Sequence, residues 1–137
     1  MDIDVVPNDQ IKIENDHVTY NEVYLFSQER NICITGSEAK LNEDIYIIFE
    51  KLQGFKVEDG KLALGLSLKA TDSEGGIIVN EEDLIGDSVM EVSELEQLAP
   101  SFIFSGSNVK NPVTCEVVIW DKKSDSKIKA SVELNVK

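Results

Sequence analysis

The segment spanning residues 62–83 constrains the fold more than any other part of the chain. Apolar residues occupy every second position at its start, namely Leu62, Leu64, Leu66, Leu68 and Ala70. Successive side chains of a strand point to opposite faces, so this spacing lines one face with apolar groups, whereas a helix would spread them around its axis. A glycine-containing turn at residues 72–76 and the apolar run 77–79 follow. The segment therefore predicts an antiparallel hairpin at the centre of a sheet.

A second hairpin is predicted at the end of the sequence. Residues 113–120 are rich in valine and isoleucine, and a polar turn at residues 121–126 follows them. The returning strand alternates strictly, with Ile128, Ala130, Val132, Leu134 and Val136 on one face. Each predicted sheet has one apolar face to bury, and two sheets packed against each other bury both. We therefore expect an all-β, antiparallel two-sheet β-sandwich of about eight strands, with an immunoglobulin-like or C2-like architecture.

One short helix is predicted near residues 93–99. Ser93 and Glu96 have the spacing of a capping box, Leu95 and Leu98 supply an apolar face, and Pro100 ends the segment. The chain has 137 residues, 42% of them hydrophobic, which suits one domain with a buried core. Residues 1–10 carry turn-forming residues and predict a flexible N-terminal arm, so the single sandwich domain is expected to span residues 11–137.

The acidic residues are numerous and unevenly distributed. The formal net charge is −13, and the interval between Lys69 and Lys110 contains nine acidic residues and no basic one. Such a surface repels nucleic acid and anionic membranes, and it attracts basic protein partners. Glu81, Glu82 and Asp83 form the densest acidic run of this interval. They are the candidate partner-binding residues, with solubility as the alternative explanation for their charge.

Catalytic patterns are weak in this sequence. His17 is the only histidine, and no spacing places a serine or cysteine beside it as a nucleophile. Gly75 and Gly76 lack the flanking residues of a phosphate-binding loop. We expect no catalytic residues and no cofactor, with a carboxylate-dependent enzyme as a second alternative because acidic residues are plentiful.

Calcium is the one cofactor for which the sequence offers ligands. An EF-hand beginning at Asp72 is excluded, because its sixth position would be Ile77 and not glycine. Two sandwich loops could instead combine their carboxylates, with Asp72 and Glu74 from one loop and Asp121 and Asp125 from the other. A calcium-binding sandwich is therefore one alternative function. A carbohydrate-binding sandwich is another, with Trp120 as a stacking platform or, in the simpler interpretation, as a cover over the core edge.

The leading interpretation is a non-enzymatic β-sandwich module that binds another protein through its acidic surface. No apolar run approaches the length of a membrane span, and the first ten residues lack the pattern of a signal peptide. We therefore expect a cytoplasmic protein, with an exported protein whose signal has been removed as the alternative.

Overall fold

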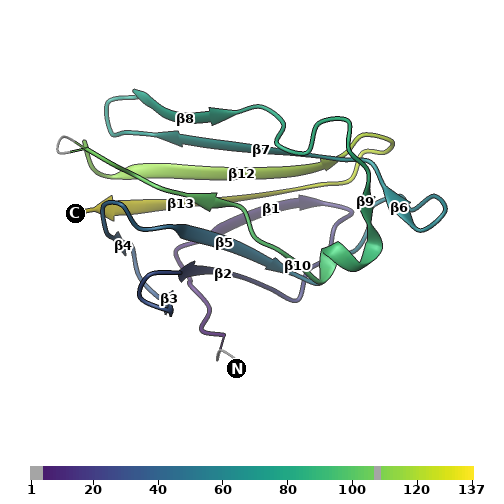
Figure 1. Ribbon diagram of the computed structural model, residues 1–137, viewed down its shortest axis with the longest axis horizontal. Helices are drawn as coiled ribbons and strands as arrows, with labels where there is room; N and C mark the ends of the chain where they lie inside the picture. The colour runs from purple at the N-terminus through teal and green to yellow at the C-terminus, as the bar shows by residue number, and fades with distance from the viewer. Residues whose placement is uncertain (1–4, 107–108) are drawn as a thin grey trace.

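Two sheets packed face to face make up the fold (Figure 1). The computed structural model describes residues 5–106 and 109–137, and in this range the chain is an all-β sandwich with almost no helix. Eight strands have three or more residues, as the sequence predicted, and five further strands have only two. Strand pairing is antiparallel except between β4 and β13.

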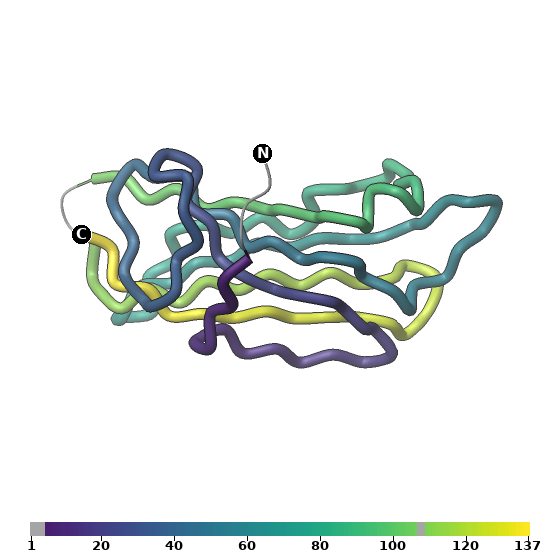
Figure 2. Tube along the Cα trace, turned by 90° about the horizontal axis from the view of Figure 1, so that it is seen from below, coloured from purple at the N-terminus to yellow at the C-terminus, as the bar shows by residue number. Residues whose placement is uncertain are grey.

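The larger sheet contains the two hairpins that the sequence predicted, but the first hairpin, at residues 64–81, lies at an edge of the sheet and not at its centre. Its order is β1-β13-β12-β7-β8, with β4 added beside the end of β13. The strands are β1 (Lys12–Asp16), β4 (Glu38–Ala39), β7 (Leu64–Thr71), β8 (Ile77–Glu81), β12 (Val113–Asp121) and β13 (Lys127–Val136). Strands β1 and β13 run side by side although they lie far apart in the sequence (Figure 2).

The smaller sheet has β5 at its centre. Its order is β10-β5-β2-β3, and β11 pairs with β5 beyond β10. The strands are β2 (Glu22–Ser27), β3 (Ile32–Ile34), β5 (Ile45–Glu50), β10 (Gln97–Leu98) and β11 (Ser101–Phe102). A separate two-stranded pair joins β6 (Lys61–Leu62) to β9 (Met90–Glu91).

The alternating residues form the core, as the period-two pattern predicted. The apolar sets of both hairpins are buried, namely Leu62, Leu64, Leu66, Leu68 and Ala70 from the first and Ile128, Ala130, Val132, Leu134 and Val136 from the second. They pack in one cluster with the apolar side chains of the smaller sheet, including Leu25, Ile47 and Phe49. This burial is the main source of stability, at about 25 cal/mol per Å² of apolar surface.

The predicted helix is replaced by a shorter element. Residues Val92–Glu96 form a 3₁₀ helix, η1, and the next two residues form β10. The Glu94 carboxylate accepts a hydrogen bond from the backbone N–H of Glu91, so the chain uses a pair two residues earlier than the predicted Ser93 and Glu96. Pairing of Leu98 with Phe49 in β5 prevents the helix from reaching residue 99. Tertiary pairing thus outweighs a weak local helix signal.

The predicted N-terminal arm is anchored at Asn8. The Asn8 amide donates hydrogen bonds to the carbonyls of Ile34 and Gly36, both at 2.8 Å, and its side-chain oxygen accepts from the N–H of Gln10. Asn8 is buried, so the chain is held in place at this position, in contrast to the flexible arm predicted for residues 1–10. Residues 1–4 of that arm lie outside the described residues. No helix in the described range is long and apolar enough to cross a membrane.

Candidate functional site

Strand β8 forms one edge of the larger sheet and presents apolar side chains to solvent. It pairs with β7 on one side only, and no other described strand continues the sheet beyond it (Figure 1). Ile77 is 63% exposed and Ile78 is 41% exposed. A β-bulge between Ala70 and Thr71 shifts the register at this end of the pair, whereas Val79 packs against the core. Exposed apolar residues on a strand edge are typical of a docking surface or of an aggregation-prone site.

Two of the three predicted partner-binding residues lie at the opposite end of β8 from these isoleucines, and both are exposed. Glu81 ends β8, opposite Leu68 of β7, and Glu82 follows it; both residues are exposed. Leu84, two positions further, is also exposed. We call the side chains of Ile77, Ile78, Glu81, Glu82 and Leu84 the β8 surface. It combines apolar area with negative charge on one edge.

Asp83, the third predicted residue, forms hydrogen bonds and an ion pair within the chain. One of its carboxylate oxygens accepts hydrogen bonds from the backbone N–H groups of Leu66, Ile85 and Gly86. The other oxygen lies 2.7 Å from the ammonium of Lys122. The hydrogen bond from Lys122, assisted by the backbone N–H groups, lowers the Asp83 pKa to about 2 against the opposing effect of burial. Asp83 therefore fixes the loop after β8.

Two other acidic residues of the interval form ion pairs with cations from distant parts of the chain. Glu74 lies 2.6 Å from Lys110, and Glu91 lies 3.6 Å from Lys61. Both pairs are exposed, so each contributes little to stability. The fold thus pairs three acidic residues of the interval, Glu74, Asp83 and Glu91, with basic residues. Glu81 and Glu82 have no cation within ion-pair distance among the described residues, and they keep the negative charge of the β8 surface.

A pocket of about 360 Å³ lies next to β8. Its lining includes Ile78 from β8, Phe104 and Val109 from the segment between β11 and β12, and the charged residues Asp72 and Lys110. Phe104 is buried in the core, so the floor of the pocket is apolar. The exposed Ile78 forms part of the lining, and the pocket has room for an apolar side chain of another molecule. Nothing in the sequence indicated it, because its walls come from segments about thirty residues apart.

The calcium hypothesis that combined two loops is wrong in its geometry. β7 and β12 are antiparallel neighbours, with Thr71 opposite Thr114 and Leu64 opposite Asp121. The loop carrying Asp72 and Glu74 therefore lies at one end of the sheet, and the loop carrying Asp121 and Asp125 lies at the other (Figure 1). At about 3.3 Å per residue, the length of β7 separates them by roughly 20 Å. These four residues cannot bind one ion together.

The carboxylates of these loops instead hold the turns. Asp72 accepts hydrogen bonds from the N–H groups of Glu74 and Gly76. The buried Asp121 accepts from the N–H groups of Lys56 and Lys123 and from the Ser124 hydroxyl. Within residues 5–106 and 109–137, no three histidine, cysteine or acidic side chains gather closely enough to hold a metal ion.

Calcium is expected to leave the thermal stability of the protein unchanged. Because the two loops are separated, millimolar calcium should shift the melting temperature by less than about 1 °C, whereas a specific site would raise it by mass action. Differential scanning fluorimetry with an equal concentration of magnesium as the control measures this. A calcium-specific rise of several degrees that Asp72→Asn abolishes would contradict the prediction.

The comparisons with known proteins add information about the fold. No known family matches the sequence, and no curated protein sequence matches it. A solved structure described as the C-terminal domain of wzt is similar in fold. The similarity has a TM-score of 0.57 at 10% sequence identity, and it covers 100% of this chain and 89% of that chain. At this identity the likeness establishes the β-sandwich and nothing about the site.

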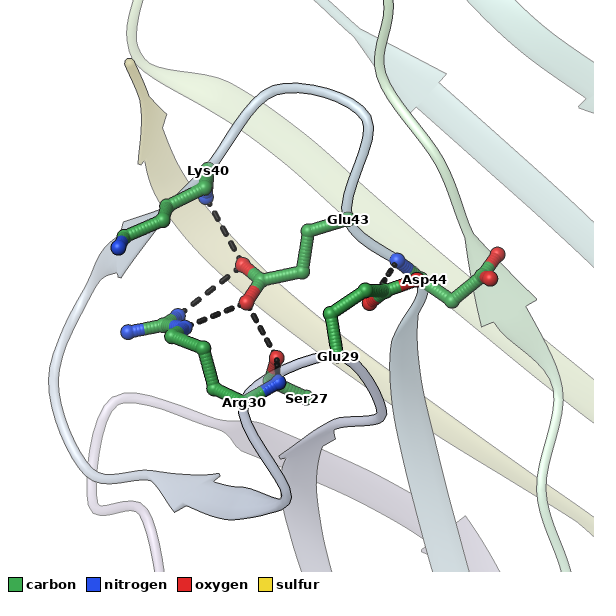
Figure 3. Close-up of polar contacts among 6 residues, drawn as sticks. All are labelled: Ser27, Glu29, Arg30, Lys40, Glu43 and Asp44. Atoms are coloured by element: carbon green, nitrogen blue, oxygen red, sulfur yellow. Dashed lines mark hydrogen bonds and ion pairs between the residues drawn. The ribbon is translucent and has the colours of Figure 1, made fainter.

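A buried carboxylate that sequence reasoning missed lies just before β5, close to the end of β2 (Figure 3). Glu43 is 3% exposed and lies between β4 and β5. It accepts hydrogen bonds from Nε and Nη2 of Arg30, at 2.5 and 3.0 Å, and from the backbone N–H of Lys40 at 2.9 Å. The buried Ser27 hydroxyl donates a further hydrogen bond. Burial would raise the Glu43 pKa, but the hydrogen bonds from Arg30, Ser27 and Lys40 outweigh it and lower the pKa to about 2.

This network has a structural role. It joins the turn after β2 to the loop before β5, and every described buried polar side-chain atom has a hydrogen-bond partner. A fully satisfied carboxylate offers no free acceptor for a substrate proton. We therefore place the candidate functional site at the β8 surface and not at Glu43.

Trp120 covers the backbone of β7 on the outer face of the larger sheet. A Cβ atom added at Gly65 would lie 2.2 Å from two atoms of the Trp120 ring, so the indole lies directly on this glycine. Trp120 pairs with Gly65 across the β12–β7 ladder and is half-buried. The indole therefore covers the backbone of β7 on the outer face and not the core edge that the sequence predicted.

Proposed function

We propose that this protein is a non-enzymatic β-sandwich module that binds a basic segment of another protein through the β8 surface. The observation that carries the proposal is the edge strand β8, which has exposed Ile77 and Ile78 at its start and exposed Glu81 at its end, with exposed Glu82 directly after it. Apolar area supplies affinity when it is buried, and the unpaired carboxylates attract a partner of opposite charge.

The distribution of exposed apolar residues supports a protein partner. Ten large apolar residues are exposed in the described part of the chain, and six of them lie between residues 77 and 103, namely Ile77, Ile78, Leu84, Val89, Val92 and Ile103. The same interval carries no basic residue. A mixture of apolar and acidic side chains suits a protein segment that is itself apolar and basic, whereas the net charge of −13 repels nucleic acid.

Reversing the charge of the β8 surface is expected to weaken partner capture. In the double variant Glu81→Lys/Glu82→Lys, the association rate with a basic partner should fall about tenfold at low salt, because electrostatic steering is lost. The difference should shrink at high salt, where screening shortens the range of the field to a few ångströms. Quantitative mass spectrometry of proteins captured from a lysate, followed by surface plasmon resonance on the captured partner, measures both effects.

The matched control changes the same amount of charge elsewhere. Glu14 on β1 and Glu133 on β13 are exposed and lie at least two strands away from β8 in the sheet order. The double variant Glu14→Lys/Glu133→Lys should retain the partner. Equal loss in both variants would show that total charge decides the capture, and an unchanged profile in Glu81→Lys/Glu82→Lys would reject the proposal.

A further inference from the structure

The two edges of the larger sheet are protected to different degrees. Strand β1, at one edge, carries charged residues at alternate positions, namely Lys12, Glu14 and Asp16. Strand β8, at the other edge, has the sequence Ile-Ile-Val-Asn-Glu and contains neither lysine nor proline. Lysine, proline and inward charges are the usual devices that stop an edge strand from pairing with another chain. The only such protective features of β8 are the charge of Glu81 at its end and the bulge at its start.

We propose that the partner binds by adding an extended, antiparallel strand to the free edge of β8. This inference rests on the proposed function and names its mode of recognition. In an antiparallel ladder, backbone N–H and C=O groups alternate in direction, so about half of the five residues of β8 direct theirs away from β7. An added strand satisfies these groups, and side-chain pockets then select its sequence.

The surroundings of β8 specify the order of residues in the added strand. Glu81 and Glu82 lie at the C-terminal end of β8, and the pocket lined by Ile78, Phe104 and Val109 lies near its N-terminal end. An antiparallel strand therefore places its first residues beside the two glutamates and its later residues beside the pocket. Basic residues followed by β-branched apolar residues match this arrangement in charge and in polarity.

A second copy of this chain is a poor occupant of the same edge. Antiparallel pairing of two β8 strands about Val79 would set Glu81 of each copy opposite Ile77 of the other. Neither Glu81 carboxylate would then face a basic side chain. Each copy also carries a net charge of −13, and the two copies repel each other. Charge complementarity thus selects a basic partner over self-association.

A designed peptide tests the backbone pairing directly. The probe is a fluorescent, end-blocked peptide with the sequence Lys-Arg-Val-Thr-Val-Thr, and its binding to the full chain is measured by fluorescence anisotropy at low salt. Two control peptides have the same sequence and charge, with N-methyl groups on alternate residues in the two possible phases. Methylation in the phase that faces β8 removes the peptide's donors and should weaken binding at least about tenfold, while the other phase should change it little.

The protein variants separate this inference from the proposed function. Glu81→Lys/Glu82→Lys should weaken the peptide about tenfold, and Glu14→Lys/Glu133→Lys should not. Hydrogen exchange should show new protection in residues 77–81 when the peptide is bound, since added pairing shields the outward amides. Equal binding of all three peptides would overturn strand addition while leaving acidic docking intact. Absence of binding by the unmethylated peptide would also overturn strand addition, and the lysate experiment would then decide the proposed function separately.

Discussion

Truncation of Phe49 to alanine is expected to lower the free energy of unfolding by about 3–5 kcal/mol. Phe49 lies in β5, the central strand of the smaller sheet, and is 0% exposed. It stands opposite Val23 of β2 and Leu98 of β10, and it belongs to the cluster shared by both sheets. Removing the ring loses its burial and leaves a cavity that neighbours on three strands cannot fill. Urea unfolding followed by circular dichroism measures the change.

The control for Phe49 is an aromatic truncation at the surface. Tyr20 is exposed, and Tyr20→Ala should change the free energy of unfolding by less than about 0.5 kcal/mol. Similar unfolding midpoints for Phe49→Ala and the parent chain would mean that the smaller sheet does not pack as described.

Replacement of Glu43 is expected to have the second largest effect. In Glu43→Gln, an NH2 group replaces one carboxylate oxygen. This group is a hydrogen-bond donor, so it faces the donor groups of Arg30, Ser27 or Lys40 and cannot accept from them. The loss of charge pairing and the unsatisfied buried donors should cost about 2–4 kcal/mol of stability at neutral pH. Glu133→Gln, at an exposed position, should cost little and serves as the control.

The same carboxylate predicts how stability depends on pH. The Glu43 pKa is about 2 in the folded chain, against an ordinary value of 4.5 that applies to the unfolded chain. The ionised carboxylate therefore stabilises the fold fully above pH 4.5. That contribution, about 3 kcal/mol, is lost as the pH falls from 4.5 toward 2, because the unfolded chain then takes up a proton more readily. Urea unfolding of the parent and Glu43→Gln chains should give curves that converge in this range. A constant difference down to pH 2 would contradict the assignment.

The core faces were predictable from the sequence because they depend on local alternation. The side chains of β7 and β13 show a period of two without interruption, and one face of each strand is buried as expected. The burial of Leu66 and Val132 required no knowledge of which strands pair. Alternation gives the face of each residue directly, because the pleat has the same period everywhere.

The ends of the sheet were not predictable, because they depend on strand order. Asp72 follows β7 and Asp121 ends β12, and both strands lead into a hairpin turn. Had β7 and β12 run parallel, the two turns would have met. They are antiparallel neighbours, so the turns lie at opposite ends. The local spacing of apolar residues does not show which distant strands are neighbours or in which direction they run.

The Glu43 network could not be predicted for a related reason. Glu43 lies in a segment with no clear helix or strand period, and its partners are Ser27 at the end of β2 and Arg30 in the turn that follows. A buried carboxylate is recognisable only when its donors are known, and these come together through the pairing of β2 with β5. By contrast, the exposure of Glu81 and Glu82 followed from composition alone, since acidic residues are rarely buried.

The position of β13 has a consequence for the way the chain acquires its structure. β13 lies between β12 on one side and β1 and β4 on the other, and it is synthesised after every one of them. Strands β1 and β4 therefore leave the ribosome before β13, and they can pair with it only after residues 127–136 have been synthesised. Closure of a sheet across such a sequence separation is slow, on the order of milliseconds to seconds, because a long loop must be ordered first. During this interval the nascent chain exposes strand edges, and a chaperone that shields them would raise the yield of native protein.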